Sequence, residues 1–393
     1  MTLVTSIPRT TEPSVIVIGG GIGGLAAAAA IANAGVSVIV LEAHVYPGGC
    51  AATFRHRGRW YDAGATLLAG FAPGGPMQLL GRAAGIRHWP VRPTELALTV
   101  YLEDGTVVAR VARDARWDFY RSAFPTSLLF WHWQEATAAL LWDFALRLPE
   151  IQPRSWASLR ETLSVTGEWL LRSRPSPQLL LDLLRPVARR LPEDPRFRRF
   201  VDAQLLIAAQ ATADEVYALY GAAVLDLPNR GVVEPAGGAG AVARTLVDAV
   251  RRHSGTVHFR QEVVEIERTQ RTWRVRTQRG LELAATHVVA DLTPWALARL
   301  WNDAPAALRR RTERPPAGWS AFLTVPQSRR QPHAGDHGVA PSGPRAGTAR
   351  RRELGLRLVE PGLGRDARPG RSARRDPEHP HDLHQLVEAG ANR

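Results

Sequence analysis

Lysine is absent from this sequence of 393 residues, so all 50 basic residues are arginine, and there is a single cysteine, Cys50. One cysteine excludes an internal disulfide, which is typical of a reducing compartment. Arginine without lysine, with abundant alanine, glycine and proline, is typical of a GC-rich genome. The net charge of +13 therefore does not by itself indicate nucleic acid. Because no aromatic-basic motif of an RNA- or DNA-binding module is present, we expect no nucleic-acid partner.

The sequence also lacks an uninterrupted membrane-spanning run. No charge occurs between Pro13 and Leu41, but glycines break this stretch, and each apolar part is shorter than the ~20 residues that a bilayer requires. The preceding residues carry Arg9 and Glu12 without an apolar core, so we expect no signal peptide. These features predict a cytoplasmic protein. The positive charge favours peripheral contact with the anionic inner face of a membrane; the oligomeric state is left open.

What is present is a strong glycine pattern near the amino terminus. Residues 15–18 are an apolar strand run, and Gly19, Gly21 and Gly24 then fill the pattern G-x-G-x-x-G before a run of alanines. Gly19 makes the tight turn, Gly21 lets the backbone approach a pyrophosphate, and Gly24 lets the helix pack closely on the strand. The amides at the helix start then face the phosphates. Gly23 lies in the same loop and belongs to the predicted set.

A second apolar run, residues 38–41, ends at Glu42, about 20 residues after the glycine pattern. A carboxylate at this point of a βαβ unit can accept hydrogen bonds from ribose hydroxyls. Gly48 and Gly49 follow, and this pair offers phosphate a second backbone approach, which favours FAD over NAD. The strand, glycine turn, helix, strand and acid together predict a dinucleotide-binding unit.

In this order the residues resemble the amino-terminal FAD segment of the phytoene desaturase and carotenoid isomerase family, within the amine oxidase-like flavoproteins. The stretch from Ala63 to Pro76 is most similar to the bacterial carotenoid 3,4-desaturase-like branch. The resemblance implies that Glu42 holds the adenosine ribose and that Gly48 and Gly49 approach the diphosphate. It also implies that the segment from Asp62 to Gly64 lies near the flavin, where an ordinary turn is the alternative interpretation.

The family resemblance returns at residues 235–240, Pro-Ala-Gly-Gly-Ala-Gly, which precede a helical pattern and several β runs. It implies that Val263 or Val264 contacts the adenine through its backbone. We therefore expect an α/β protein with a Rossmann-type FAD/NAD(P)-binding domain in two segments and an inserted α+β substrate domain. The expected boundaries are 1–90 and 230–324 for the FAD-binding domain and 91–229 for the insertion.

The insertion begins with alternating β residues on either side of a hairpin signal at Asp104-Gly105 and continues as a tryptophan-rich helical pattern. The resemblance places a substrate tunnel here, and tryptophan suits a long apolar ligand. Packing within a domain core explains most of these aromatic residues equally well. Prolines predict short helices after residue 149, the longest of them at residues 200–210 and 216–225.

The last part of the chain differs in composition. Phe322 is the last aromatic residue, and residues 325–393 are rich in arginine, proline and glycine without an apolar period. Such a segment can be a nucleic-acid or metal-binding tail. The family resemblance implies a further sheet and a last flavin-contacting segment here, and the sequence shows the pattern of neither. Out-of-frame translation of GC-rich DNA gives such a mixture of arginine, proline, glycine and alanine, so we interpret the segment as a disordered, out-of-frame product. Its histidines are then accidental, and we expect no metal site; they are His333, His337, His379, His381 and His384.

The expected activity is that of an FAD-dependent oxidoreductase resembling carotenoid desaturases, with hydride transfer from a long apolar polyene to the flavin. Carotene cis-trans isomerisation with reduced flavin is the first alternative, and amine oxidation is a more distant one. An inactive remnant without turnover is an alternative of another class. The sequence identifies no catalytic acid or base, and for Asp62 a structural role is the stronger interpretation.

Overall fold

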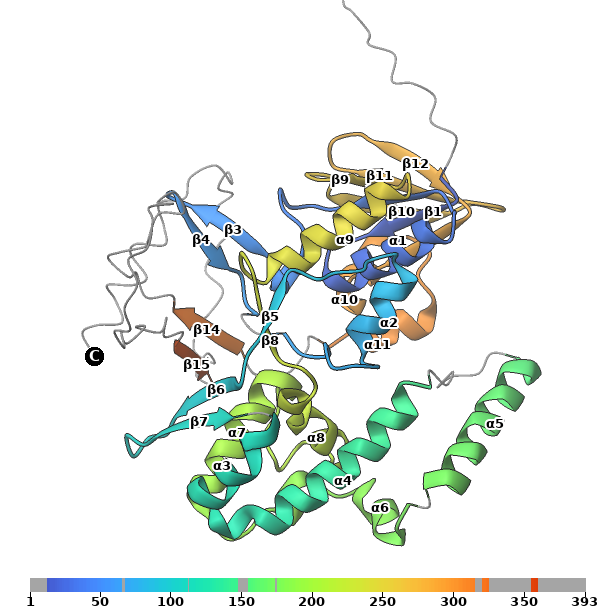
Figure 1. Ribbon diagram of the computed structural model, residues 1–393. Coiled ribbons are helices and arrows are strands. Elements are labelled where there is room, and N and C mark those ends of the chain that lie inside the picture. Colours follow the sequence, from blue (N-terminus) through green and yellow to red (C-terminus); the bar gives the residue numbers. More distant parts are fainter. Residues whose placement is uncertain are drawn as a thin grey trace, which may run out of the picture.

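The computed structural model describes residues 13–65, 68–111, 113–147, 155–173, 175–314, 320–324 and 355–359. Its centre is a four-stranded parallel sheet (Figure 1) in the order β13 (His287–Ala290), β1 (Val15–Ile18), β2 (Val38–Leu41) and β9 (Thr256–His258). All four strands are short and three are wholly apolar runs or nearly so, which is the pattern of parallel strands covered on both faces.

Two layers cover this sheet because successive side chains of a strand point to opposite faces. Val15 and Val17 pack with α1 (Ile22–Asn33) and α9 (Gly240–Arg252) on one face. Ile16 and Ile18 pack on the other face with the antiparallel strands β10 (Val263–Arg268), β11 (Trp273–Thr277) and β12 (Glu282–Ala285). The sheet is therefore a middle layer between helices and a smaller sheet.

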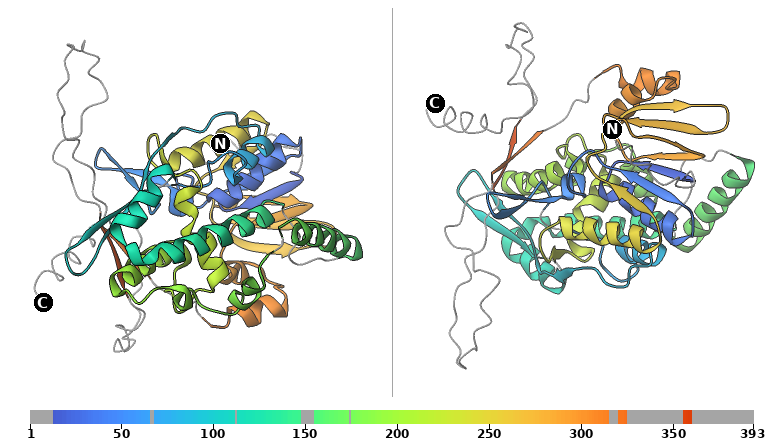
Figure 2. Two further views of the ribbon diagram at one scale, coloured as in Figure 1. Left: turned by 60° about the horizontal axis from the view of Figure 1, so that its bottom comes forward. Right: turned by 90° about the horizontal axis from the view of Figure 1, so that it is seen from above.

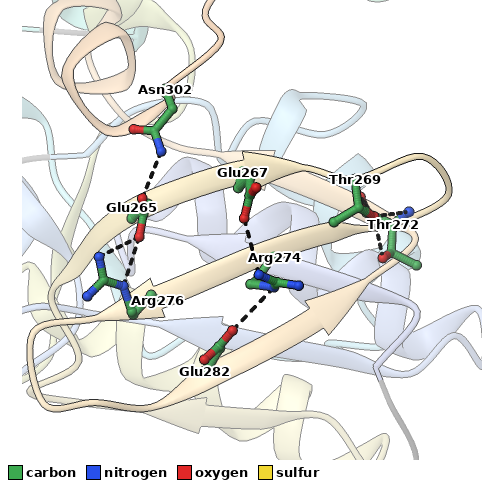
Figure 3. Close-up of polar contacts among 8 residues, drawn as sticks. All are labelled: Glu265, Glu267, Thr269, Thr272, Arg274, Arg276, Glu282 and Asn302. Atoms are coloured by element: carbon green, nitrogen blue, oxygen red, sulfur yellow. Dashed lines mark hydrogen bonds and ion pairs between the residues drawn. The ribbon is translucent and has the colours of Figure 1, made fainter.

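The outer face of the smaller sheet carries charged residues that pair across the strands (Figure 3). Arg276 pairs with Glu265, and Arg274 pairs with both Glu267 and Glu282. Asn302 donates to Glu265 at 2.7 Å, and this hydrogen bond, with the neighbouring Arg276, lowers the pKa of Glu265. The charges of this face satisfy one another, as expected for a solvated sheet surface.

Shorter elements connect the central sheet to the insertion. The hairpin of β3 (Thr53–His56) and β4 (Arg59–Asp62) is followed by α2 (Pro76–Ala83). The strands β5 (Val91–Pro93) and β8 (Val233–Pro235) pair antiparallel where the chain enters and leaves the insertion. The expected domain boundaries at residues 90 and 230 stay a prediction.

The insertion contains the hairpin of β6 (Leu96–Tyr101) and β7 (Val107–Val111), and it continues with helices α3 (Arg116–Ala123), α4 (Leu128–Ala145), α5 (Trp156–Ser173), α6 (Pro177–Asp182), α7 (Pro195–Ala209) and α8 (Ala218–Leu225). Its core is aromatic: Trp131, Tyr120, Phe197 and Phe200 are fully buried, and the rings of Tyr120 and Trp131 stack at 4.2 Å. These aromatic side chains therefore pack in the interior of the inserted domain.

Among the helices after residue 149, the expectation that residues 200–210 and 216–225 form the longest ones is wrong. The 18-residue α5 is longer than the 15-residue α7 and the 8-residue α8. Pro153 and Pro175 bracket α5 without interrupting it. Its leucines are not gathered into a buried stripe, so the periodicity that identifies a helix is weak. Figure 2 shows α5 at the edge of the molecule in both views.

The remaining elements are short. After the central sheet the chain forms α10 (Pro294–Leu300) and α11 (Ala306–Thr312), and β14 (Ser320–Thr324) pairs antiparallel with β15 (Gly355–Val359). Apart from β15, the expected tail of residues 325–393 lies outside the described residues. Single 3-10 turns lie at Gly49–Ala51, Arg113–Ala115, Pro125–Ser127, Val187–Arg190 and Leu227–Asn229. Within the described part of the chain, no helix is both long and apolar enough to cross a bilayer.

Candidate functional site

The glycine loop lies between β1 and α1, at the carboxyl edge of the parallel sheet. Gly19 has φ +102°, a left-handed conformation that glycine adopts without strain. A Cβ on Gly24 would overlap the carbonyl oxygen of Gly19, so Gly24 permits the close helix–strand packing expected of it. Among the described residues, none accepts a hydrogen bond from the amides of Ile22 or Gly23. The first turn of α1 therefore presents free backbone donors, as an anion site at a helix start requires.

The second glycine pair lies against this loop. The amide of Gly48 donates to the carbonyl of Gly20 at 2.8 Å, and Gly48 forms a parallel β-bridge with Gly21. Gly48 and Gly49 have φ +115° and +56°, and a Cβ on Gly49 would lie 3.5 Å from the Cα of Gly21. Two side-chain-free backbone segments thus meet at one place, although about 27 residues separate them in the chain.

Glu42 is 7% exposed at the end of β2 and is anchored by backbone amides. Its Oε2 accepts from Gly20 at 2.5 Å, and its Oε1 accepts from His44 at 2.7 Å. The carboxylate therefore holds the glycine loop and the turn after β2 in place. Each oxygen keeps further acceptor capacity, so the expected contact with ribose hydroxyls stays a prediction.

Asp291 is the site residue to which the sequence assigned no role. It follows β13, and its Oδ2 accepts from the amide of Gly24 at 2.8 Å. A Cβ on Gly21 would lie 2.6 Å from the same oxygen, and one on Gly23 would lie 2.9 Å from Oδ1. The available signal was an acid directly after a buried strand, because the carboxyl ends of parallel strands meet at one edge.

Asp62 contacts the loop before α9. Its Oδ1 accepts from the hydroxyl of Thr53 at 2.5 Å and from the amide of Ala239 at 2.9 Å. The hydroxyl oxygen of Thr53 accepts in turn from the amide of Gly240, the first residue of α9, at 2.8 Å. These contacts give Asp62 a structural role: it holds the segment that contains Gly237 and Gly238, and the start of α9, in place. A position near the flavin stays a prediction for Asp62 and Gly64.

Gly64 and Val264 lie in different surroundings. A Cβ on Gly64 would lie 2.8 Å from the carbonyl oxygen of Cys50, so Gly64 packs on the turn that follows Gly49. The side chain of Val264 is 39% exposed in β10. The chain just before β10 lies beside the end of β2, because the amide of Gln261 donates to the carbonyl of Glu42 at 2.8 Å. The start of β10 therefore lies near Glu42. The adenine contact of Val264 stays a prediction.

No cluster of three potential metal ligands occurs in the part of the chain that the structure describes. The histidines of residues 325–393 lie outside that part. A shallow hollow over the paired charges of Figure 3 is lined by Glu265, Glu267, Arg274, Arg276 and Glu282. Its side chains are taken up by one another, so the glycine loop with its two flanking acids is the stronger candidate site.

Comparison with known proteins points to one family. The family model described as flavin containing amine oxidoreductase matches residues 22–322. Prolycopene isomerase 2, chloroplastic, of an Oncidium hybrid cultivar is 26% identical over 298 residues, which are 74% of this chain and 50% of that protein. Phytoene desaturase of Cercospora nicotianae is 43% identical over 63 residues, which are 16% of this chain and 10% of that protein.

Among solved structures, cyclohexylamine oxidase of Brevibacterium oxydans has a TM-score of 0.52 at 21% identity, covering 80% of this chain and 65% of that one. This likeness concerns the fold, which is the expected α/β arrangement around a parallel sheet. The chain spans about half the length of the prolycopene isomerases that it matches.

Proposed function

Because this chain belongs to the family of flavin-containing amine oxidoreductases, we propose that it is an FAD-dependent oxidoreductase that acts on a long apolar polyene. Family membership makes FAD the cofactor. Prolycopene isomerase matches 74% of the chain and phytoene desaturase matches 16% of it. Prolycopene and phytoene, which these relatives are named for, are both carotenoids. The expected reaction is desaturation, in which an allylic carbon loses a hydride and a neighbouring carbon loses a proton.

The observation that carries the cofactor proposal is the meeting of two glycine segments at the start of α1. Gly21 and Gly48 bridge there, and the amides of Ile22 and Gly23 point out of the helix without an acceptor among the described residues. A diphosphate needs such side-chain-free backbone and free amides. The residues present therefore fit the diphosphate of FAD.

The roles of the remaining residues follow from their positions. Gly48 and Gly49 would approach the diphosphate from the second side, and Glu42 would hold the ribose while its amide contacts keep the loop in shape. Asp62 and Thr53 would keep the start of α9 in place beside the site. When bound, FAD supplies the hydride acceptor. The protein would position the substrate and exclude water, and no side chain is assigned as acid or base.

Expression of the full chain in a host that accumulates an acyclic carotenoid tests this proposal. Desaturation removes a pair of hydrogens for each new double bond, so the product should have a lower mass and a longer-wavelength absorption. Flavin-loaded protein that leaves the carotenoid unchanged in mass and in isomer composition would contradict the proposed activity. Flavin-free protein with no turnover would instead favour the inactive remnant.

Carotenoid isomerisation is a second candidate, because four relatives that match 71–74% of the chain are named prolycopene isomerases. It changes the chromatographic retention of the polyene at constant mass. The same extract therefore separates the two reactions: a mass change identifies desaturation, and a retention change without a mass change identifies isomerisation.

For partners, we propose that the protein acts at the cytoplasmic face of a membrane, where an apolar substrate dissolves. Helix α5 exposes Trp156 (83%), Leu163 (62%) and Leu171 (80%), and an exposed apolar helix face with tryptophan favours shallow insertion. Arg160 and Arg172 of α5 are balanced by Glu161 and Glu168, so attraction to anionic lipid would come from the whole chain, with net charge +13.

Flotation with phosphatidylglycerol vesicles tests this contact. Replacing Trp156 and Leu163 with serine should reduce the bound fraction severalfold, because it removes apolar side chains that would insert into the bilayer. Both side chains are exposed, so the replacements cost little folding energy. Leu129, which is 84% exposed in the first turn of α4, provides the matched control, Leu129→Ser. Equal flotation of all three proteins would contradict a contact through α5.

A further inference from the structure

The carboxylate of Asp291 lies at the start of α1. Of the first-turn amides of α1, that of Gly24 donates to Asp291 at 2.8 Å, whereas those of Ile22 and Gly23 have no acceptor among the described residues. The carboxylate also fills the side of Gly21 on which a Cβ would lie, 2.6 Å from its Oδ2. Asp291 therefore lies at the same helix start that the diphosphate requires.

A second carboxylate lies on the other side of the same loop. The strand order β13-β1-β2 places Asp291 after one neighbour of β1 and Glu42 after the other. Glu42 accepts from Gly20 at 2.5 Å, and the two acids thus flank the glycine loop. Among the described ion pairs, neither Glu42 nor Asp291 has an arginine partner that would compensate its charge.

The two acids differ in accessibility. Glu42 is buried, and both of its oxygens accept amides, so it is built into the loop. Asp291 is exposed, and among the described residues its carboxylate accepts one hydrogen bond, from the amide of Gly24. Gly23 is exposed as well, so a ligand can reach both residues from solvent. A phosphate that binds there approaches a carboxylate within a few ångströms.

We infer that Asp291 sets the affinity of the glycine loop for the diphosphate, an inference that rests on the proposed FAD site. Without a ligand, its carboxylate takes the place of an anion at the helix start and stabilises the loop through Gly24. With a ligand, the same charge opposes the phosphates and weakens binding. Asp291 thus stabilises the loop of the apo-protein and lowers its affinity for FAD.

The substitution Asp291→Asn separates charge from hydrogen bonding, because asparagine keeps an oxygen that can accept from Gly24. Apo-protein of the full chain is titrated with FAD, and the quenching of flavin fluorescence gives the affinity without reference to activity. The variant should bind FAD about tenfold more tightly at low salt, as expected from removing one like charge a few ångströms away. The advantage should shrink towards none at about 1 M salt, where the Debye length is ~3 Å.

Two further variants control for the loss of charge and test the hydrogen bond to Gly24. Glu161→Gln removes one negative charge from α5 in the inserted domain and should leave FAD affinity unchanged. Asp291→Ala removes both the charge and the acceptor, and it should lower the melting temperature of the apo-protein relative to Asp291→Asn. That difference, measured without cofactor, reports the hydrogen bond to Gly24 directly.

The outcomes separate this inference from the proposal on which it rests. Wild-type protein that binds FAD as tightly as Asp291→Asn, or more tightly, would overturn the inference and leave the FAD site intact. A gain in affinity that is the same at low and high salt would overturn its electrostatic basis. A full chain that binds no FAD in either form would overturn both.

Discussion

The carboxylate of Asp62 accepts a hydrogen bond at 2.9 Å from the amide of Ala239, 177 residues later in the chain. Thr53 extends this contact, since its hydroxyl donates to Asp62 and accepts from Gly240. The β3–β4 hairpin of the first chain segment thereby caps α9 of the second. The two segments are thus joined by side-chain contacts as well as by the pairing of β2 with β9.

Thr53→Val should destabilise the protein by about 1–2 kcal/mol, because it removes the side-chain acceptor at the start of α9 and leaves the amide of Gly240 without its partner. Valine keeps the shape of threonine, so packing changes little. Urea unfolding measures the effect. Thr53→Ser keeps the hydroxyl and is the control; equal losses for both variants would show that the cap contributes nothing.

Much of the dinucleotide unit could be predicted from sequence because its signals are local. The turn at Gly19 and the close packing at Gly24 each follow from the absence of a side chain at one position, and Glu42 directly follows the strand that places it. The contact of Asp291 with Gly24 could not be predicted in this way. It depends on which strand lies beside β1, and 267 residues separate the two partners.

The inserted domain shows the opposite case. Its β hairpin at Asp104-Gly105 was predicted and is present as β6 and β7, because the turn and the alternation are local signals. Only short helices were expected in this region, and the length of α5 was not predicted, because much of its apolar surface faces outwards, at Trp156, Leu163 and Leu171. Sequence patterns identify a helix by the face that it buries, and α5 buries little beyond Trp169, which packs on Phe144 at 5.0 Å.

Glu42→Gln should lower both stability and flavin content. One of its two carboxylate oxygens becomes an amide group, which cannot accept from Gly20 or His44, so a buried donor loses its partner at a cost of about 1–3 kcal/mol. Urea unfolding and the flavin absorbance of purified protein measure the two effects. Glu234→Gln, at an exposed ion pair with Arg92, is the control and should change neither.

The buried carboxyl of Asp226 should make the stability of the fold depend on pH. Burial raises the pKa of its carboxyl above the ordinary value of 3.8, although Asn229 and Arg230 oppose the shift. The folded state therefore holds this proton more strongly than the unfolded state. The stability that the group contributes is fully present below pH 3.8 and is lost as the pH rises through the raised pKa.

Unfolding of wild type and Asp226→Asn across the acid range tests this sign. The free energy of unfolding of wild type, minus that of Asp226→Asn, should fall as the pH rises. Asp104 gives a control of opposite sign, because the hydrogen bond from the Thr106 amide lowers its pKa. The corresponding difference for Asp104→Asn should fall as the pH decreases through the lowered pKa. A difference for Asp226 that grows with pH would refute its assignment as a carboxyl destabilised by burial.

The flavin content of the purified full chain and of Gly21→Val is the most direct test of the proposed diphosphate site at the glycine loop. Valine at this position would meet the Asp291 carboxylate and close the backbone approach to the diphosphate. Gly167→Ala, where nothing lies within 4 Å of an added Cβ, controls for the loss of a glycine. We expect bound FAD in wild type and Gly167→Ala and none in a folded Gly21→Val. Full FAD occupancy in Gly21→Val would contradict a diphosphate site at this loop.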